Sequence, residues 1–336
     1  MSKFSFNLLE NRVFPFTKTE DSDVVLGAAF GEDVALTKVG GDILASHVDP
    51  IVGAVGNIGW LAVHVACNDI AASGIAPRWI QLLVLVPSID DEDLLESIMS
   101  DAGRAARELA ITIIGGHTGY SAGLSRPLVA VTALGPASGR RPIRTGGARA
   151  GDYVLVTKGI GLEGTAILAH DFADVAHQLG LGDKELDEGR NVMKSVSVLP
   201  EALLLADNGV SAMHDVTRGG LLETLLEIAH LSGIGMEIDA SRLPIPPIVA
   251  RFAQAFQFDP TGMISSGTLA VTVPDTHLAQ VEDALNESGT PFAVVGRVKA
   301  GHGVSVTREG VVTHYGEVRP QEDELARLWR VYPRNR

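Results

Sequence analysis

The 336-residue sequence is poor in cysteine and in positive charge. Its one cysteine, Cys67, excludes an internal disulfide, and no Cys or His spacing suggests a zinc site. Cys67 lies in an apolar run and is predicted to be a small core residue. With 27 Lys and Arg against 41 Asp and Glu, the net charge is −14. This charge repels phosphate backbones and anionic membranes, so we expect no nucleic-acid or membrane partner.

Long hydrophobic runs are also missing. The N-terminal stretch MSKFSFNLLENRVF has no apolar core long enough for a signal peptide, and no segment has the length of a membrane span. A cytoplasmic protein is therefore expected. No GxxxxGK[ST] string occurs, and we identify no GxGxxG that opens a Rossmann unit. These absences argue against a P-loop or dinucleotide-binding fold.

The pattern of short β-branched runs and amphipathic or apolar segments predicts a mixed α/β protein. The length suits two domains, and the Gly-, Pro- and Arg-rich stretch 136–152 is predicted to join them. We predict an N-terminal domain over 1–145, a C-terminal domain over 146–305 and a tail over 306–336. A surface turn cluster within one domain is the alternative explanation of the glycine-rich stretch.

Three acids lie where an apolar element meets a turn. Asp69 interrupts the apolar segment 56–74, which is predicted to be a buried helix, while Asp33 lies in GEDVAL and Asp49 ends the strand ILASHV. A salt bridge or polar cap would explain Asp69 alone, since a lone buried carboxylate is costly. Acids gathered without basic partners tolerate one another around a divalent cation, and Mg²⁺ prefers carboxylates plus phosphates. We therefore predict that these three acids hold Mg²⁺.

Two glycine-containing strings complete the candidate site. In GGHT, a predicted strand ends on Gly115 and Gly116, so the backbone could approach a phosphate, although this string is weak evidence by itself. In HDVTRGGLLE, residues 214–223, a strand would deliver Asp215 to its end. Thr217 would bond locally or cap the next helix, and Arg218 would reach an anion. Gly219 and Gly220 would present free N–H groups at the helix N-terminus. A plain helix cap with a surface arginine is the alternative.

The strings GEDVAL, NDIAASG, GGHT and HDVTRGGLLE, in this order, resemble the aminoimidazole ribonucleotide (AIR) synthetase superfamily of PurM-like proteins. The resemblance spans about residues 25 to 300, and the form MHDVTRGGL is most similar to HypE-like and synthetase-related members. It implies a PurM-like two-domain fold. The N-terminal domain would form a dimeric β-barrel with a second copy, next to a C-terminal α/β domain, with ATP and Mg²⁺ in the cleft.

The resemblance also assigns roles to residues. It implies that Asp33, Asp49 and Asp69 hold metal and polyphosphate. The residues expected to bind the nucleotide are Asn68, Gly115, Gly116, Thr118, Asp215, Thr217, Gly219 and Gly220. Arg218 would steady the transferring group, and His117 and His214 flank the proposed site. One departure is His117, because many relatives carry an acid there and histidine is a poor Mg²⁺ ligand.

The expected function is phosphoryl transfer from ATP to an oxygen of a small molecule, with Arg218 and His117 as candidate catalytic residues and no identified base. One alternative is a non-catalytic nucleotide-binding or scaffold protein, in which His117 has replaced a needed acid. The other is a hydrogenase-maturation accessory. The chain ends RVYPRNR without the reactive cysteine of HypE, so the carbamoyl-to-cyanide reaction is not expected.

Overall fold

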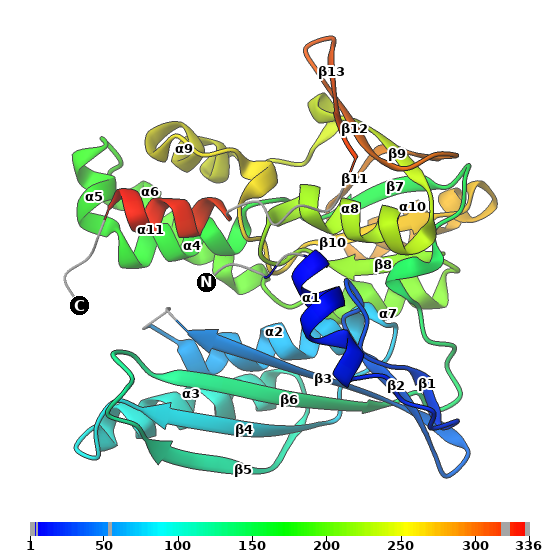
Figure 1. Cartoon of the computed structure of the whole chain (residues 1–336). Helices are drawn as coiled ribbons and strands as arrows, with labels where there is room; N and C mark the ends of the chain where they lie inside the picture. Colours follow the sequence, from blue (N-terminus) through cyan, green and yellow to red (C-terminus); the bar gives the residue numbers. More distant parts are fainter. Residues whose placement is uncertain (1–3, 5, 53–55, 317–322, 333–336) are drawn as a thin grey trace.

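The computed structural model describes residues 4, 6–52, 56–316 and 323–332, and it contains two β-sheets with helices packed against them (Figure 1). The six-stranded sheet lies in the lower half of Figure 1 and the seven-stranded sheet in the upper half. Residues 137–152 connect β6 of the first sheet to β7 of the second. In the described residues, no helix is long and apolar enough to cross a bilayer.

The first sheet has the strand order β1-β2-β3-β6-β4-β5. Its strands are β1 (Val24–Leu26), β2 (Ala35–Val39), β3 (Asp42–Val52), β4 (Trp79–Val86), β5 (Thr112–Tyr120) and β6 (Leu128–Pro136). All neighbours pair antiparallel except β4 and β5, which are parallel. β2 and β3 form a hairpin that turns at Gly40 and Gly41, whose φ angles are 57° and 90°.

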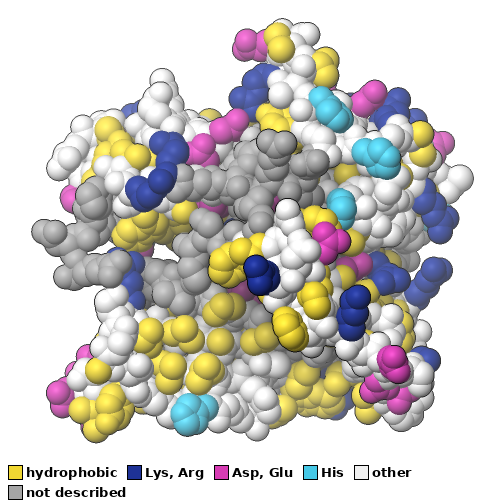
Figure 2. Space-filling view, in the orientation of Figure 1, with side chains coloured by type: hydrophobic (Ala, Val, Ile, Leu, Met, Phe, Trp, Pro, Cys, Tyr) yellow, Lys and Arg dark blue, Asp and Glu magenta, His cyan; other side chains and the backbone are white. Residues whose placement is uncertain are grey.

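One face of this sheet is covered by α2 (Ile58–Ala72) and α3 (Glu92–Glu108). Every residue of α2 is buried, as its uniformly apolar sequence predicts. The opposite face is open: burial alternates along β6 and β4, and Val48 on β3 is 60% exposed. Figure 2 shows hydrophobic side chains gathered over the lower part of the molecule, where Figure 1 places this sheet.

The second sheet has the order β13-β12-β9-β11-β7-β10-β8. Its strands are β7 (Tyr153–Thr157), β8 (Ala212–Asp215), β9 (Gly235–Asp239), β10 (Leu269–Val273), β11 (Phe292–Lys299), β12 (Gly303–Arg308) and β13 (Val311–Tyr315). Both faces of its central strands are covered, whereas the edge strand β13 is exposed. Val154 and Val156 pack with α8 (Gly220–Ser232), while Leu155 packs with α7 (Leu199–Asp207) and α10 (Leu278–Ser288).

The remaining helices gather beside the second sheet. They are α4 (Leu162–Asp171), α5 (Ala173–Gln178), α6 (Asp183–Asn191), α9 (Pro247–Phe256) and α11 (Glu324–Val331). They share a core containing Phe172, Phe252 and Phe256, and Trp329 of α11 packs edge-on against Phe172 at 4.6 Å between ring centroids. The short helix α1 (Phe6–Arg12) lies in front of the junction between the two sheets (Figure 1).

Short 3-10 helices complete the chain: η1 (Phe14–Phe16), η2 (Thr145–Gly147), η3 (Val192–Ser195), η4 (Ala240–Arg242), η5 (Pro260–Gly262) and η6 (Asp275–His277). The mixed α/β, two-part architecture is confirmed. The strand β12 crosses the boundary predicted at 305/306, and β13 extends the same sheet, so the second sheet continues to residue 315. The division into domains stays a prediction.

Candidate functional site

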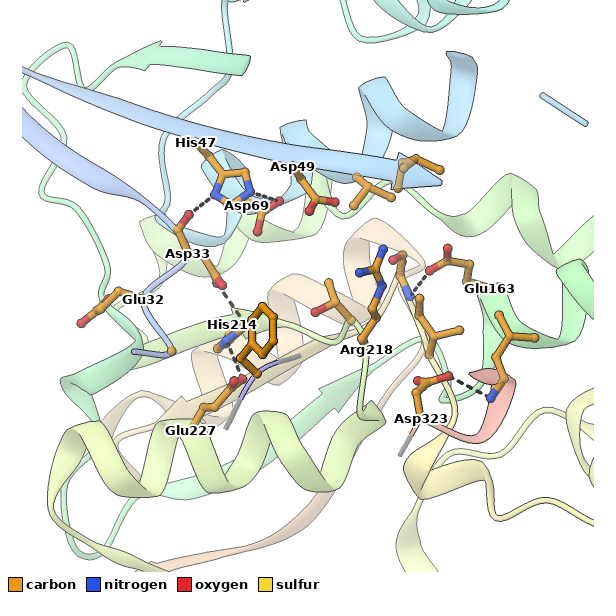
Figure 3. Close-up of a pocket in the computed structure, with 18 of the residues that line it drawn as sticks. Glu32, Asp33, His47, Asp49, Asp69, Glu163, His214, Arg218, Glu227 and Asp323 are labelled. Atoms are coloured by element: carbon orange, nitrogen blue, oxygen red, sulfur yellow. Dashed lines mark hydrogen bonds and ion pairs between the residues drawn. The ribbon is translucent and has the colours of Figure 1, made fainter. Parts of the chain in front are cut away.

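A cavity of about 450 Å³ is lined by residues from both sheets and from the helices beside the second sheet. Asp33 enters it from the loop before β2, Asp69 from α2, Arg218 from the loop after β8 and Trp329 from α11. The pocket therefore combines segments that lie up to about three hundred residues apart in the chain. Figure 3 shows how the labelled side chains face one another across it.

The three predicted metal-binding acids meet in this pocket. Asp33, Asp49 and Asp69 all line it, and they lie on one side of the view in Figure 3. Burial raises the pKa of Asp69 well above its usual value, and the charges of Asp215 and Asp33 raise it further. The Oδ2 atom of Asp69 lies 3.4 Å from Nε2 of His47. A divalent cation would relieve the repulsion between Asp69 and the neighbouring carboxylates. The residues present therefore fit the predicted Mg²⁺.

His214 lies within a second acidic cluster beside these residues. One ligand atom from each of Asp33, His214 and Asp215 lies within 4.8 Å of the others, but only the two carboxylates could ligate a metal while His214 is protonated. The His214 Nδ1 atom is 3.0 Å from Asp33 Oδ2, and Nε2 is 3.2 Å from Glu227 Oε2. Burial opposes protonation of His214, but Asp33, Asp215 and Glu227 outweigh it and hold its pKa well above the usual value. His214 is therefore an internal cation among these acids.

Asp215 itself is fully buried at the end of β8. Within the described part of the chain, neither of its carboxylate oxygens accepts a hydrogen bond, and Oδ1 lies 3.7 Å from His214 Nδ1. A buried carboxylate without hydrogen bonds is costly unless another charge compensates it. This orphaned group is the second observation that fits a bound cation.

The other side of the pocket carries Arg218, Glu163 and Asp323 (Figure 3). Among the residues that the structure describes, Arg218 makes no hydrogen bond and no ion pair within 4.0 Å. Burial raises the pKa of Glu163 to about 7, although Ser266 and Arg218 lower it. The pocket thus offers an available guanidinium opposite a set of acids, which suits a ligand that carries both phosphates and metal.

Comparison with known proteins shows the family of the chain. Residues 31–137 match the N-terminal domain of AIR synthase related proteins, and residues 149–309 match the C-terminal domain of the same family. The carbamoyl dehydratase HypE of Azotobacter vinelandii is 30% identical over 264 residues, covering 76% of this chain and 74% of the relative. The chain belongs to the AIR synthase-related family. HypE of Rhodobacter capsulatus is 29% identical over 263 residues, with the same coverage of 76% and 74%.

Solved structures extend the likeness to the fold of this AIR synthase-related chain. The crystal structure of Escherichia coli HypE superposes with a TM-score of 0.70 at 26% identity, over 83% of this chain and 87% of that one. The structure of the HypE–HypF complex superposes with a TM-score of 0.74 at 20% identity, over 92% of this chain and 99% of that one. The structure of ThiL with AMPPCP and TMP superposes with a TM-score of 0.72 at 18% identity, over 92% of this chain and 96% of that one. The predicted PurM-like two-domain fold is confirmed.

The glycine motif after β8 differs from the prediction in two respects. The N–H of Gly219 donates to Asp323 Oδ2 at 3.0 Å, and the N–H of Gly220 donates to the carbonyl of Thr217 at 3.1 Å. Neither group is free for an anion, contrary to the expectation. The Thr217 side chain does not cap α8 either, because Gly219 is the N-cap residue and α8 has no side-chain cap. Thr217 and Arg218 nevertheless line the pocket.

Asn68 is buried and does not line the pocket. Its Nδ2 donates to the carbonyl of Val196 at 2.7 Å, and its Oδ1 accepts from the N–H of Val198 at 2.9 Å. The amide therefore ties α2 to the segment before α7. Within this chain its side chain is engaged in packing the two halves together, and a role in nucleotide binding stays a prediction.

The GGHT string lies elsewhere. The strand does not end at Gly115 and Gly116, as predicted, but continues as β5 to Tyr120. A Cβ on Gly116 would come within 1.9 Å of the Leu82 carbonyl oxygen, so this glycine permits close pairing at a register shift between β4 and β5. His117 and Thr118 are exposed on this edge strand and do not line the pocket. The structure does not bring these four residues together with the acids within one chain.

Sequence reasoning missed His47, Glu163, Glu227 and Asp323. The signal for Glu163 was present in GIGLEG, residues 159–164, a GxGxxG string that follows β7 and opens α4. It is not a Rossmann unit, because β7 lies between two antiparallel neighbours. Its amides are engaged: the N–H of Gly161 donates to Ser265 Oγ at 2.8 Å, and that of Gly164 to the Ile264 carbonyl at 3.1 Å. This loop holds Glu163 toward the pocket.

Proposed function

We propose that this protein is a Mg²⁺-dependent ATP-using enzyme that activates an oxygen of a small molecule by phosphoryl transfer. The observation that carries the proposal is one pocket in which Asp33, Asp49 and Asp69 face Arg218, whose guanidinium is unpaired among the described residues. An acidic pocket repels a triphosphate unless cations mediate its binding. Carboxylates that share a divalent ion, with a guanidinium opposite, supply that mediation.

The relatives support this reaction type. HypE relatives at 29% and 30% identity are named carbamoyl dehydratases. Among structures of the same fold, one of HypE is in complex with ATP, and the ThiL structure holds AMPPCP and TMP. Use of ATP on a small molecule is thus the chemistry that relatives and pocket have in common.

We assign the residues as follows. Asp33, Asp49 and Asp69, joined by Asp215, hold the metal, which when bound supplies positive charge to the phosphates. Arg218 orients the transferring phosphoryl group and stabilises its developing charge. His214 remains protonated between Asp33 and Glu227 and fixes the orientation of both acids.

A homodimer is part of the proposal. The open face of the first sheet carries apolar side chains, and Val48 on this face is 60% exposed. An apolar sheet face of this kind marks an interaction surface in soluble proteins. A second copy that covers this face with its own would form the shared barrel that the family resemblance implies. The GGHT strand lies at the edge of this sheet, so dimerisation would enclose residues that are exposed in one chain.

The proposal is tested by calorimetric titration with Mg·AMPPCP and by release of ADP from Mg·ATP. Both are measured alone and with pools of hydroxyl-, carboxamide- and carbamoyl-bearing metabolites. We expect Mg²⁺-dependent binding and ADP release that rises at least tenfold with one pool. Binding without turnover in every pool would favour the scaffold alternative, and absence of binding would exclude both.

The relatives' names favour one second candidate, an accessory role in hydrogenase maturation. The sole cysteine of the sequence does not suit a carbamoyl carrier, because Cys67 is 1% exposed and burial raises the pKa of its thiol. This candidate requires a stable complex with a carbamoyl-transferring protein. Mass spectrometry of proteins that co-purify with the tagged chain tests it, with the chain denatured before capture as the control.

A further inference from the structure

We propose that Glu163 is the general base of this site, which accepts the proton of the acceptor group during phosphoryl transfer. This inference rests on the proposed function and names the proton acceptor, which the metal-binding aspartates cannot provide. Carboxylates that hold a metal are not available for proton transfer. His117 lies on the edge strand β5, outside the pocket.

The position of Glu163 is fixed by its surroundings. It lies in the first turn of α4, lines the pocket and is only 3% exposed. Its Oε2 accepts the N–H of Ser266 at 3.4 Å, and in the described residues it forms no ion pair within 4.0 Å. A buried carboxylate with one long hydrogen bond retains the capacity to accept another. The adjoining Gly161 and Ser265 contact holds the start of the helix in place.

The other carboxylates on the pocket wall are engaged. Glu227 pairs with His214 at 3.2 Å, and Glu32 lies 3.9 Å from Arg144. Asp323 accepts hydrogen bonds from the N–H groups of Gly219, Leu325 and Ala326 and serves as the cap of α11. Outside the metal cluster, Glu163 is thus the pocket carboxylate held by a single long hydrogen bond and by no ion pair among the described residues.

The burial of Glu163 also favours its role as a general base. It raises the pKa of Glu163 to about 7, against the lowering effects of Ser266 and Arg218. A base with a pKa near the working pH is the most effective, because it is both available and strong enough to take a proton. Arg218 beside it would hold the phosphoryl group close to the acceptor that Glu163 deprotonates.

The side chains that line the pocket near Glu163 indicate which class of substrate accepts the phosphoryl group. Ile167, Ile264 and Leu325 are each 9% exposed and line the pocket together with Trp329. This surface suits a small acceptor with an apolar portion and one hydroxyl or amide group. In the step, Glu163 takes the proton as the O–H bond of a hydroxyl acceptor breaks, or as the N–H bond of an amide acceptor breaks while the amide oxygen attacks. The oxygen forms a bond to the γ-phosphorus, the bond from that phosphorus to the β–γ bridging oxygen breaks, and its electron pair leaves with ADP. The proton then passes to solvent.

The test uses full-length protein and Mg·ATP, with water and the metabolite pools as acceptors. We expect Glu163→Gln to lower ADP release at least about 100-fold, which is the lower range for loss of a general base. Binding of Mg·AMPPCP should stay within about threefold, which is about 0.65 kcal/mol. The natural chain should gain rate as the pH rises through about 7, since the base must be ionised, and Glu163→Gln should lack this dependence.

Two further variants guard against misfolding. Ser266→Ala should move the pH midpoint upward, because Ser266 lowers the pKa of Glu163. Glu201→Gln is the matched control: Glu201 is also 3% exposed, pairs with Lys158 outside the pocket and should keep the natural rate. If Glu163→Gln retains the natural rate and pH dependence, Glu163 is not the base, although the proposed function stands. If the natural chain neither binds nor turns over the nucleotide, the proposed function fails and the base with it.

Discussion

The carboxylate of Asp323 accepts a hydrogen bond from the backbone N–H of Gly219, 3.0 Å away, in the interior of the pocket. Gly219 belongs to the motif that sequence analysis assigned to phosphate binding, and Asp323 begins the last described helix. An acid of the protein thus takes the position beside Arg218 that an anionic ligand would use. Burial raises the pKa of Asp323, although the Gly219 N–H lowers it.

Replacement of Asp323 by Ala should therefore strengthen nucleotide binding. Removing the carboxylate frees the Gly219 N–H and removes a negative charge near Arg218, so the affinity for Mg·AMPPCP should rise about three- to tenfold, or about 0.7–1.4 kcal/mol. The loss of a helix cap should lower stability by about 1 kcal/mol. Titration calorimetry measures the first effect. Asp239→Ala, which removes the cap of η4, is the control and should leave affinity unchanged. Weaker binding by the Asp323 variant would instead show that this carboxylate organises the site.

Replacement of Asp69 by Asn should stabilise the metal-free protein. The folded-state pKa of Asp69 lies above its usual 3.8, so its ionised form is destabilising above the folded pKa. The natural chain should gain stability from this group as the pH falls toward 3.8, and the Asn variant should lack that gain. At pH 8 without metal, we expect its melting temperature to be higher by at least about 2 °C, which corresponds to somewhat under 1 kcal/mol. Added Mg²⁺ should stabilise only the natural chain.

An equal response of both proteins to Mg²⁺ would place the metal away from Asp69. Glu201→Gln serves as the control here too, because Glu201 is a buried acid that pairs with Lys158 at 2.5 Å. It should show the natural response to Mg²⁺. The measurement is thermal unfolding with and without the ion in the same buffer.

Replacement of Arg218 by Ala should remove activity with little loss of stability. Arg218 makes no hydrogen bond or ion pair within the described residues, so its removal breaks no interaction of that kind among them. We expect ADP release to fall about 10²–10³-fold and the free energy of unfolding to change by less than about 0.5 kcal/mol. Arg251→Ala, which breaks a 2.7 Å ion pair with Glu185 outside the pocket, is the control for loss of an arginine. A fall in activity of less than tenfold would leave Arg218 without a role in transfer.

Replacement of Val48 by Asp should weaken self-association. Val48 lies at the centre of the open face, on β3, where a second copy would bury it. A buried unpaired charge costs several kcal/mol, so the dimer constant should weaken by about 100-fold or more. Light scattering coupled to gel filtration measures the mass. Val311→Asp, at a position 66% exposed on β13, is the matched control and should remain dimeric. A natural chain that is monomeric at all concentrations would contradict the dimer itself.

The sequence predicts the elements of the fold well where one physical signal dominates. The uniformly apolar stretch before Asp69 is a helix buried on every face, and Gly233 ends α8 in a left-handed conformation, as its position after the helical pattern indicates. Asp33, Asp49 and Asp69 line one pocket, although Asp49 lies within β3 and Asp69 within α2 rather than at a turn, and their role in metal binding stays a prediction. Asp69 stands out in the sequence as a charged residue in an apolar segment. Such residues are costly alone, which makes them visible in the sequence.

Other features depend on contacts that no local pattern encodes. The glycines of GGHT look like a strand end but lie inside β5, because Gly116 accommodates the backbone of β4. The Gly219 N–H is occupied because a helix about a hundred residues later brings Asp323 to it. Glu163 was visible in principle, as another acid in an apolar helix, but only the tertiary structure places it beside Arg218.

The walls of the pocket come from segments attached to different sheets, with Asp69 on one side and Arg218 on the other. A molecule held there is in contact with both halves, so its binding free energy opposes their independent melting. Scanning calorimetry of the ligand-free chain and of the saturated complex should therefore differ in shape as well as in temperature. Occupancy should merge separate or broadened heat-absorption peaks into a single cooperative one.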